Sequence, residues 1–500
     1  MKATVFAVAL AVVAGWQPAS VPAARAQLVI VVDGLRPDYI DAIRMPRLAR
    51  LAARGIVFNA HHSVFPTVTR LNGASFVTGT YPENHGLLGN TVFVPSVDPR
   101  RGLDTGRREN LERIAGAEGR LLTAPSLGEI LKGAGKTMMA LGSGTTGAVF
   151  VLNDRVASGG IIHPDYARPI ELQQQIAARF GSAPPSGTPN GAQHRRVVDA
   201  YLQLVLDTYQ PDLTWIWLND PDATAHAHGM SAAATRESLT IVDTEIGRIE
   251  DSLRASGRLD RTNLIVTSDH GFSKHTGALR LGALAEPFAR PLPDGSPDIV
   301  VAEGAIYLRG AADEGRRAAL VSALQRHPAV GAIFTRPKPA GGFEGSVPGT
   351  LSFDVARWNH PRSGDVLVSA NWTDEADAAG IKGQTAQIGV AGHGTSSPYD
   401  IHNTLIAAGP DLRERASSEV PTSNVDLAPT LLRLLGLPVP QTMTGRVIEE
   451  GLKSGPLPAS IAVTHETHIV STADGSYQLT ARISIARGKR YLDATEVMRK

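Results

Sequence analysis

The sequence predicts an α/β fold built around a central, mainly parallel sheet with helices on both faces. Two observations support this fold class: short runs of β-branched and apolar residues end at turn residues, and helical patterns separate these runs. The chain has 500 residues, 42% of them hydrophobic, which suits one large domain with insertions or about two to three smaller ones. The four clearest strand-like runs are LVIVVDG (28–34), TWIWLND (214–220), TNLIVTSDHG (262–271) and NTLIAAGP (403–410).

The N-terminal residues have the pattern of a secretory leader. Lys2 precedes an apolar stretch of about 14 residues, and the small-x-small sequence ARA ends at Ala26. The stretch is too short to span a bilayer stably, and no later segment of the sequence is long and apolar enough to do so. We therefore expect residues 1–26 to be a signal peptide and the mature chain to be periplasmic or secreted, without a stable membrane anchor after cleavage.

The region between the first two strand-like runs alternates helical and strand-like patterns. In APSLGEILKGAG (124–135), Ser126 and Glu129 have the spacing of a helix N-terminal capping box, and Gly133 is a candidate helix stop. The strand-like run TMMALG (137–142) follows. This βαβ alternation is typical of parallel sheets.

Two later regions depart from this pattern. Residues 273–390 contain short strand-like pieces, a helix near 318–326 and a loop rich in Pro and Gly, so we expect a smaller inserted subdomain there. Beyond residue 455, the sequence alternates around ADGS (473–476), which predicts a β-hairpin over 456–500. The main domain would then cover 27–455, with the insertion inside it.

The composition restricts the class of partner. The chain has 49 basic and 48 acidic residues, a net charge of +1, and no long run of either sign. Neither a nucleic acid polymer nor an anionic membrane surface is therefore expected as a partner, and a small molecule is favoured. Because the chain has no Cys, it can form no disulfides, and any metal site must use nitrogen and oxygen ligands.

Carboxylates follow three of the strand-like runs. Asp33 ends the first run, Asp220 and Asp222 end the second, and Asp269 ends the third. Ligands of open α/β sheets bind beyond the carboxyl ends of the strands, so these acids are expected at one edge of the sheet. Carboxylates at three strand ends of one sheet edge together indicate a cation. Asp220, the second carboxylate after TWIWLN, is expected to orient a metal ligand and not to bind the metal itself.

Three histidines strengthen the prediction of a metal site. His226 lies four residues after Asp222, His270 directly follows Asp269, and His393 lies in AGHG before the last strand-like run. Three Asp and three His residues are enough for two sets of three ligands. Zinc accepts imidazole nitrogen and carboxylate oxygen, and a catalytic zinc keeps an open position for water or substrate. The residues therefore predict two zinc ions.

Thr69, within FPTVTRLNG, is the candidate nucleophile. It has no acid or base nearby in the sequence to activate it, but coordination to a metal would make its hydroxyl an alkoxide. Paired metals typically stabilise the attacking and leaving oxygens of an in-line displacement on phosphate esters. Phosphoryl chemistry on a small phosphate ester is therefore the favoured reaction class.

Several motifs occur in a characteristic order between Leu28 and about Leu437. They are VDGLRPDYI, FPTVTRLNGASFVTGTYPENHGLLGN, PDATAHAHG, TSDHGF, AGHG and NVDLAPTLLRLLG. Together they resemble the alkaline phosphatase superfamily and, within it, the nucleotide pyrophosphatase/phosphodiesterase (type I phosphodiesterase) family. The resemblance implies an alkaline-phosphatase-like core, with the insertion as a cap, and a metal-dependent phosphodiesterase or phosphatase activity.

The resemblance also implies roles for individual residues. Asp33, Asp269 and His270 would hold one zinc, to which the Thr69 alkoxide also binds, and Asp222, His226 and His393 would hold the other. Asn90, 21 residues after Thr69, would donate its side-chain amide to a non-bridging phosphoryl oxygen. Thr69 would attack phosphorus, and water would hydrolyse the covalent phosphothreonine.

One position departs from the family pattern. The nucleophile of the family is usually followed by an aromatic residue that stacks on a nucleotide base, whereas Arg70 follows Thr69 here. Arg70 could instead bind an anionic group of the substrate, or it could be a solvated loop residue.

The alternatives to a phosphodiesterase are a phosphomonoesterase, a phosphonate hydrolase and an inactive zinc-binding relative. A monoesterase needs additional cationic groups, and no Lys-x-Arg pair follows TMMALGSGTTGAVF (137–150), which favours diesters. A sulfatase is disfavoured, because Thr occupies the nucleophile position and the chain has no Cys.

Overall fold

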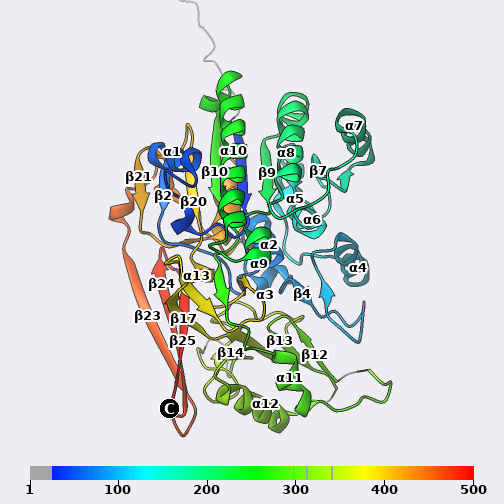
Figure 1. Ribbon diagram of the computed structural model, residues 1–500, viewed down its shortest axis with the longest axis vertical. Coiled ribbons are helices and arrows are strands. Elements are labelled where there is room, and N and C mark those ends of the chain that lie inside the picture. The colour runs from blue at the N-terminus through cyan, green and yellow to red at the C-terminus, as the bar shows by residue number, and fades with distance from the viewer. Residues whose placement is uncertain (1–24, 297, 311–312, 339–341) are drawn as a thin grey trace, which may run out of the picture.

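A nine-stranded sheet forms the centre of the protein (Figure 1). The computed structural model describes residues 25–500 except 297, 311–312 and 339–341. Strands β10, β1, β9, β6 and β7 are neighbours in this order and run parallel, whereas β20 and β8 are antiparallel to β10 and β7. The strands across the sheet are β21 (Ala416–Ser418), β2 (Ile56–Phe58), β20 (Leu405–Ala408), β10 (Thr262–Thr267), β1 (Ala26–Val32), β9 (Leu213–Leu218), β6 (Met138–Gly142), β7 (Gly160–His163) and β8 (Tyr166–Arg168).

The prediction of a mainly parallel sheet is confirmed, and the run NTLIAAGP forms the antiparallel strand β20.

The side chains of β1 explain why its sequence is continuously apolar. Leu28 and Ile30 lie in one hydrophobic core, and Val29 and Val31 lie in a second core on the other face. Since both faces of the strand are buried, the polar and apolar alternation of a half-exposed strand is absent there.

Helices cover both faces of the sheet, as predicted. One core includes residues of α1 (Pro46–Arg54), α8 (Gly191–Ala200) and α10 (Ala233–Ala255). The other includes residues of α2 (Thr69–Thr78), α5 (Leu127–Gly133), α6 (Thr146–Leu152) and α14 (Leu427–Leu434). Further helices are α3 (Pro82–His85), α4 (Arg108–Glu118), α7 (Ile170–Phe180), α9 (Asp222–His228), α13 (Pro398–Ile401) and a π-helix (Tyr201–Tyr209) that continues α8.

The predicted capping box is present at the start of α5. The Ser126 hydroxyl accepts a hydrogen bond from the Glu129 amide, and the Glu129 carboxylate accepts one from the Ser126 amide at 2.9 Å. The helix ends at Gly133, as predicted, and β6 begins five residues later at Met138. The capping box therefore accounts for the start of the helix. Beyond its end, Gly135 adopts the positive φ, 68°, that turns the chain toward β6.

The segment after β10 forms two smaller sheets below the central sheet in Figure 1. The five-stranded sheet, in spatial order, consists of β12 (Ile299–Ala302), β13 (Ala305–Leu308), β16 (Val366–Ala370), β14 (Val330–Thr335) and β15 (Leu351–Ser352). The four-stranded sheet consists of β17 (Trp372–Ala376), β18 (Lys382–Thr385), β11 (Ser273–His275) and β19 (Ala391–Gly392). Helices α11 (Leu281–Ala285) and α12 (Glu314–Arg326) belong to the same segment.

The C-terminal residues form a three-stranded antiparallel sheet. Strands β23 (Val463–Ser471) and β24 (Tyr477–Ala486) are the predicted hairpin around ADGS, and β25 (Lys489–Arg499) adds a third strand that was not predicted. A two-residue turn, Arg487 and Gly488, joins β24 to β25, and both residues have positive φ, at 51° and 73°. An X-Gly pair between two apolar runs was the sequence signal for this second turn.

Two pairs of short strands connect loops near the edge of the central sheet: β3 (His61–His62) with β22 (Thr422–Ser423), and β4 (Thr91–Val92) with β5 (Leu103–Asp104). The predicted signal peptide lies outside the described residues except for Arg25 and Ala26. Within the described part of the chain, none of the helices combines the length and the apolar character that crossing a membrane requires.

Candidate functional site

The acids predicted at the strand ends meet at one edge of the central sheet. Asp33 directly follows β1, Asp269 lies two residues after β10, and Asp222 begins α9 after β9. Since β10, β1 and β9 are adjacent and parallel, their carboxyl ends lie together. Hydrogen bonds join the three segments: the Asp222 amide donates to the Asp33 carbonyl at 3.2 Å, and the Gly34 amide donates to Asp269 Oδ1 at 3.1 Å.

A first cluster of candidate metal ligands consists of Asp33, Asp269 and His270. One potential ligand atom from each residue lies within 4.8 Å of the other two. His270 Nε2 is 2.9 Å from Asp269 Oδ2 and 3.6 Å from Asp33 Oδ1. All three residues are buried. The arrangement is the one that the family resemblance implied for one zinc.

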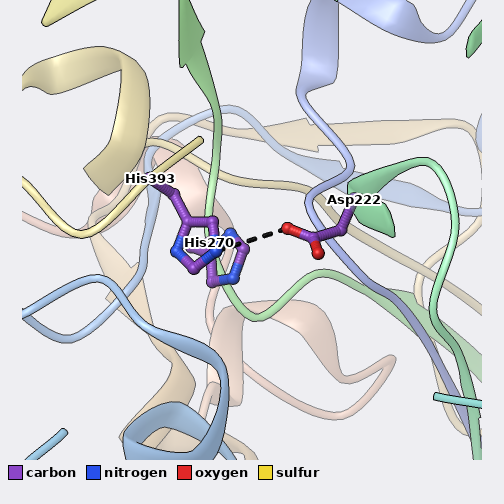
Figure 2. A group of neighbouring side chains, drawn as sticks. All are labelled: Asp222, His270 and His393. Carbon is purple, nitrogen blue, oxygen red and sulfur yellow. Dashed lines mark ion pairs between the residues drawn. The ribbon is translucent and has the colours of Figure 1, made fainter. Parts of the chain in front are cut away.

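A second cluster surrounds Asp222. His226 Nε2 and His393 Nε2 each lie 3.3 Å from Asp222 Oδ1. His270 also lies near the second cluster, because its ring stacks on the ring of His393 with centroids 3.4 Å apart (Figure 2). One potential ligand atom from each of Asp222, His270 and His393 lies within 4.8 Å of the other two. His270 therefore lies between the two clusters.

The three histidines are oriented by backbone carbonyl groups. His226 Nδ1 is 2.8 Å from the Ala391 oxygen, His270 Nδ1 is 3.0 Å from the Gly271 oxygen, and His393 Nδ1 is 2.8 Å from the Thr67 oxygen. Because a carbonyl oxygen can only accept, we assign the proton to Nδ1 in each case. The Nε2 lone pairs then face the carboxylates, which is the orientation that metal-binding histidines need.

Each carboxylate of the two clusters has one oxygen without a hydrogen-bond donor. These buried oxygens are Asp33 Oδ1, Asp222 Oδ1 and Asp269 Oδ2. Asp33 Oδ2, by contrast, accepts a hydrogen bond of 2.9 Å from Trp217 Nε1. Buried carboxylate oxygens without donors are unfavourable unless a cation compensates them. The donor set of carboxylate oxygen and imidazole nitrogen therefore fits divalent ions such as zinc.

The pKa shifts of the site differ between its residues. Burial opposes protonation of His226 and His270, but the neighbouring charges of Asp222 and Asp269 raise the pKa of these two imidazoles above the usual value. Burial raises the pKa of Asp33 well above its usual value, and the charges of Asp269 and Asp222 raise it further. Burial also lowers the pKa of His393 well below its usual value, with additional lowering by His270 and His226. The unprotonated imidazole of His393 is the form that binds metals, and added positive charge would favour ionised carboxylates.

Thr69 lies beside the first cluster. It is the first residue of α2, it is buried, and its hydroxyl oxygen is 3.3 Å from His270 Nε2. The loop before α2 is fixed by Asn72, whose side-chain amide donates to the carbonyls of Val64 and Val68 at 3.0 and 3.1 Å. The start of this helix therefore holds the candidate nucleophile at the carboxylate and histidine cluster.

Arg70 follows Thr69 in α2, and Asn90 contacts Arg70. Asn90 Oδ1 accepts a hydrogen bond of 2.9 Å from the Arg70 backbone amide, which leaves the Asn90 Nδ2 group as a donor for another partner. The Arg70 side chain is only 12% exposed, with Nη2 3.9 Å from Asp104 Oδ1 and Nε donating to Thr105 Oγ1 at 3.4 Å. Arg70 is thus held by its surroundings rather than free in solvent.

Asp220 has a supporting position. Its buried carboxylate accepts hydrogen bonds from the Asn190 amide at 2.7 Å and from the Thr224 hydroxyl at 2.6 Å, and it contacts His194 Nε2 at 2.9 Å. These contacts connect the loop before α9 to α8. The structure does not bring Asp220 into either ligand cluster of the described residues.

Some supporting residues were not found by sequence reasoning. Trp217, in the apolar run of β9, has no local feature that distinguishes it from a core residue. Asn424 opens the motif NVDLAPTLLRLLG and donates to Asn72 Oδ1 at 2.8 Å and to the Asp269 carbonyl at 2.7 Å. The motif was noted in the sequence, but the role of this amide in joining the nucleophile helix to a ligand segment needs the structure.

An α/β sheet with clusters of carboxylate and histidine at its carboxyl edge is typical of metal-dependent hydrolases. The family model described as type I phosphodiesterase / nucleotide pyrophosphatase matches residues 27–380, and the chain belongs to this family. The resemblance seen in the sequence is therefore confirmed.

Curated relatives include two human proteins. Ectonucleotide pyrophosphatase/phosphodiesterase family member 1 is 26% identical over 288 residues, which cover 54% of this chain and 27% of that protein. Family member 7 is 26% identical over 261 residues, which cover 52% of this chain and 50% of that protein. The matched segment thus spans between about a quarter and a half of the length of these relatives.

Solved structures of similar fold include murine ectonucleotide pyrophosphatase/phosphodiesterase 5. One has a TM-score of 0.60 and 19% sequence identity, and the matched region covers 86% of this chain and 100% of the murine chain. Another, an inactive Thr-to-Ala variant in complex with AMP, has a TM-score of 0.58 and 19% identity, and it covers 83% of this chain and 96% of that chain. This similarity establishes the alkaline-phosphatase-like fold.

Proposed function

We propose that this chain is an exported two-zinc hydrolase of phosphoric esters, with phosphodiesterase or nucleotide pyrophosphatase activity and Thr69 as its nucleophile. The observation that carries the proposal is the position of the Thr69 hydroxyl, 3.3 Å from His270 Nε2, beside buried carboxylate oxygens that lack donors. Membership in the type I phosphodiesterase family supports the reaction class.

Two sets of side chains would hold the metal ions. They are Asp33, Asp269 and His270 together with Thr69, and Asp222, His226 and His393. Bound zinc would lower the pKa of a coordinated hydroxyl or water and stabilise charge on the phosphoryl oxygens. The Nδ1 contacts of the three histidines to backbone carbonyls support these assignments, because they keep Nε2 unprotonated toward the ligand sites.

The reaction itself uses Thr69 and Asn90. The deprotonated Thr69 oxygen attacks phosphorus, the P–O bond to the leaving group breaks, and a phosphothreonine forms. Asn90 Nδ2 donates a hydrogen bond to a non-bridging phosphoryl oxygen, where negative charge develops. A water molecule then attacks the phosphothreonine from the side that the leaving group vacated, and Thr69 is regenerated.

A small phosphodiester is the favoured substrate class. A relative of known structure is described in complex with AMP, which supports a nucleotide-type product at the equivalent position. The helix after β6, α6 (Thr146–Leu152), contains no Lys or Arg that could bind the additional charge of a monoester. A phosphomonoesterase or a phosphonate hydrolase is the second candidate, because the partly buried Arg70 could supply that cation instead.

The proposal extends to organisation and location. Residues 27–455 would form the catalytic domain, residues 273–390 a cap within it, and residues 456–500 an appended sheet. Residues 1–26 would direct export to the periplasm or the medium, and the names of the relatives, which are ectoenzymes, support an extracellular or periplasmic location.

The test is a panel of aryl diesters, nucleotide diesters, aryl monoesters and aryl phosphonates, measured on zinc-loaded protein and on Thr69→Ala. We expect diester hydrolysis by the wild type, loss after chelation and recovery with zinc. Thr69→Ala should lower turnover by several orders of magnitude with metal content unchanged. A variant that keeps more than about a tenth of the rate, a loss of under ~1.4 kcal/mol in barrier, would remove Thr69 from this role. A wild type that binds zinc and hydrolyses none of the esters would be an inactive relative.

A further inference from the structure

The turn between β12 and β13 carries a glutamate from the inserted segment to the proposed substrate-binding loop. Glu303 Oε2 accepts a hydrogen bond of 2.6 Å from the Asn90 amide and one of 3.2 Å from the Thr91 amide. Glu303 lies 213 residues after Asn90, so this contact joins distant parts of the chain. The backbone of Asn90 is thus held from the insertion, while its side chain is held by the Arg70 amide.

The backbone of Glu303 indicates that its side chain has a specific task. Glu303 has a φ of 58°, in the left-handed region, within the two-residue turn that joins Ala302 to Ala305. Gly, Asn and Asp are the residues preferred in such turns, because they adopt this conformation at low energy. Glutamate in a disfavoured conformation supports the hypothesis that its carboxylate is needed where the turn places it.

The loop that receives Glu303 leaves room for the carboxylate. A Cβ atom placed on Gly89 would lie 2.8 Å from Glu303 Oε2, closer than normal packing allows. Glycine at this position therefore permits the carboxylate to reach the two amides. The same contact can be disturbed from either side, by changing Glu303 or by adding a methyl group at Gly89.

Charge links Glu303 to the centre of the site. Glu303 is an exposed residue, but its carboxylate packs against the loop; local burial of the carboxylate raises the pKa of Glu303, while the positive charge of Arg70 and the two backbone amides act to lower it. Arg70 acts in the same sense on Asp222, in the second ligand cluster. Arg70 therefore lies within electrostatic reach of both the insertion and the metal ligands, and Glu303 partly balances its charge.

We propose that Glu303 is a positioning residue, through which the inserted subdomain holds Asn90 in the orientation that binds the phosphoryl oxygen. The inference rests on the proposed function, since it acts through Asn90. The inserted subdomain is then part of the reaction machinery as well as a cover. Its hairpin fixes the donor that must already be in place when charge develops on phosphorus.

The test compares Glu303→Ala, Glu303→Gln and Gly89→Ala in zinc-loaded protein, with Glu344→Ala as the control. Glu344 belongs to the same insertion, is exposed and pairs with Lys338. Loss of a whole oxyanion donor costs about 10²- to 10³-fold in rate, so loss of its support should lower kcat about 10-fold with little change in KM. Glu303→Gln should recover part of this loss, because its amide oxygen can still accept.

Two further measurements separate positioning from a general structural role. In an Asn90→Ala background, Glu303→Ala should lower kcat by less than about 2-fold more, because residues that act as a unit are not additive. Hydrogen exchange of the Asn90 and Thr91 amides should be faster in Glu303→Ala and Gly89→Ala than in the control.

The outcomes distinguish this inference from the proposed function. A kcat of Glu303→Ala equal to that of the control, or full additivity with Asn90→Ala, would overturn the positioning role alone. Wild-type turnover by Asn90→Ala, or a wild-type protein without activity on phosphate esters, would instead overturn the proposed function on which the inference rests.

Discussion

Removing the indole donor of Trp217 should weaken metal binding without disturbing the fold. Trp217 Nε1 donates to Asp33 Oδ2 at 2.9 Å, and both residues are buried. This bond favours the ionised carboxylate, which is the form that binds a metal. A hydrogen bond to a charged group contributes about 1.5 to 3 kcal/mol, so Trp217→Phe should lower metal affinity about 10- to 100-fold.

Trp215 offers a matched control on the same strand. Trp215 is fully buried, and its indole nitrogen has no hydrogen-bond partner. Both tryptophan rings contact Phe76, with centroid distances of 5.6 Å for Trp215 and 5.9 Å for Trp217. Trp215→Phe therefore removes the same volume without removing a bond to a ligand. We expect wild-type metal affinity in this variant.

Zinc affinity is measured by competition with a chromophoric chelator, and metal content by elemental analysis. Thermal unfolding in excess chelator verifies that both metal-free variants fold. If Trp217→Phe binds zinc as tightly as the wild type, the hydrogen bond does not orient or charge Asp33. If both variants lose affinity equally, packing on β9 is responsible instead of the indole donor.

Three other predictions follow from named contacts. Asn90→Ala should lower turnover about 10²- to 10³-fold with zinc still bound, as measured by steady-state kinetics and elemental analysis. If the variant loses zinc or fails to fold, Asn90 has a structural role instead. Arg70→Ala should lower kcat/KM about 10- to 100-fold for substrates with an anionic group beyond phosphorus, and much less for neutral aryl diesters. An equal loss of kcat/KM for the two substrate classes would mean that Arg70 only supports its loop. Burial, together with the charge of His360, lowers the pKa of His85 to about 3. Because the unfolded chain binds this proton below about pH 6.5 and the folded chain does not, the free energy of unfolding should fall as pH decreases from 6.5 toward 3, by up to about 1.4 kcal/mol per pH unit. His85→Gln should flatten this dependence in denaturant titrations, and an unchanged slope would contradict the assignment.

Local patterns in the sequence predicted the parts of the structure that depend on neighbouring residues. The capping box of Ser126 and Glu129 set a helix start, and apolar runs that end in aspartate located β1, β9 and β10 together with Asp33, Asp222 and Asp269. Parallel pairing of adjacent strands then requires their carboxyl ends to lie together. The fold class and the meeting of the carboxylates were therefore accessible without coordinates.

Other features depend on contacts between distant residues. From the sequence alone, Trp217 is expected to be a core residue of a buried strand, and its hydrogen bond to Asp33 joins residues 184 positions apart. Glu303 is expected to be an ordinary turn residue, and its hydrogen bond to Asn90 joins residues 213 positions apart. The position of His270 between two clusters follows from ring stacking on His393, which no spacing in the sequence encodes. Side-chain partners of this kind are set by tertiary packing, which local periodicity does not report.

The place of β1 in the central sheet has a consequence for biosynthesis. This strand is the first of the described residues, yet its partners are β9 and β10. One edge stays unpaired until β9 ends at Leu218, 186 residues after the end of β1 at Val32, and the other until β10 ends at Thr267, 235 residues after Val32. Seven residues with an almost wholly apolar sequence must remain unpaired during that time without associating with other chains. The order of synthesis therefore makes assembly of the site a late step. For a chain that is proposed to cross a membrane before folding, this delay is an advantage, because β1 cannot complete its pairing in the central sheet before β10 has been made.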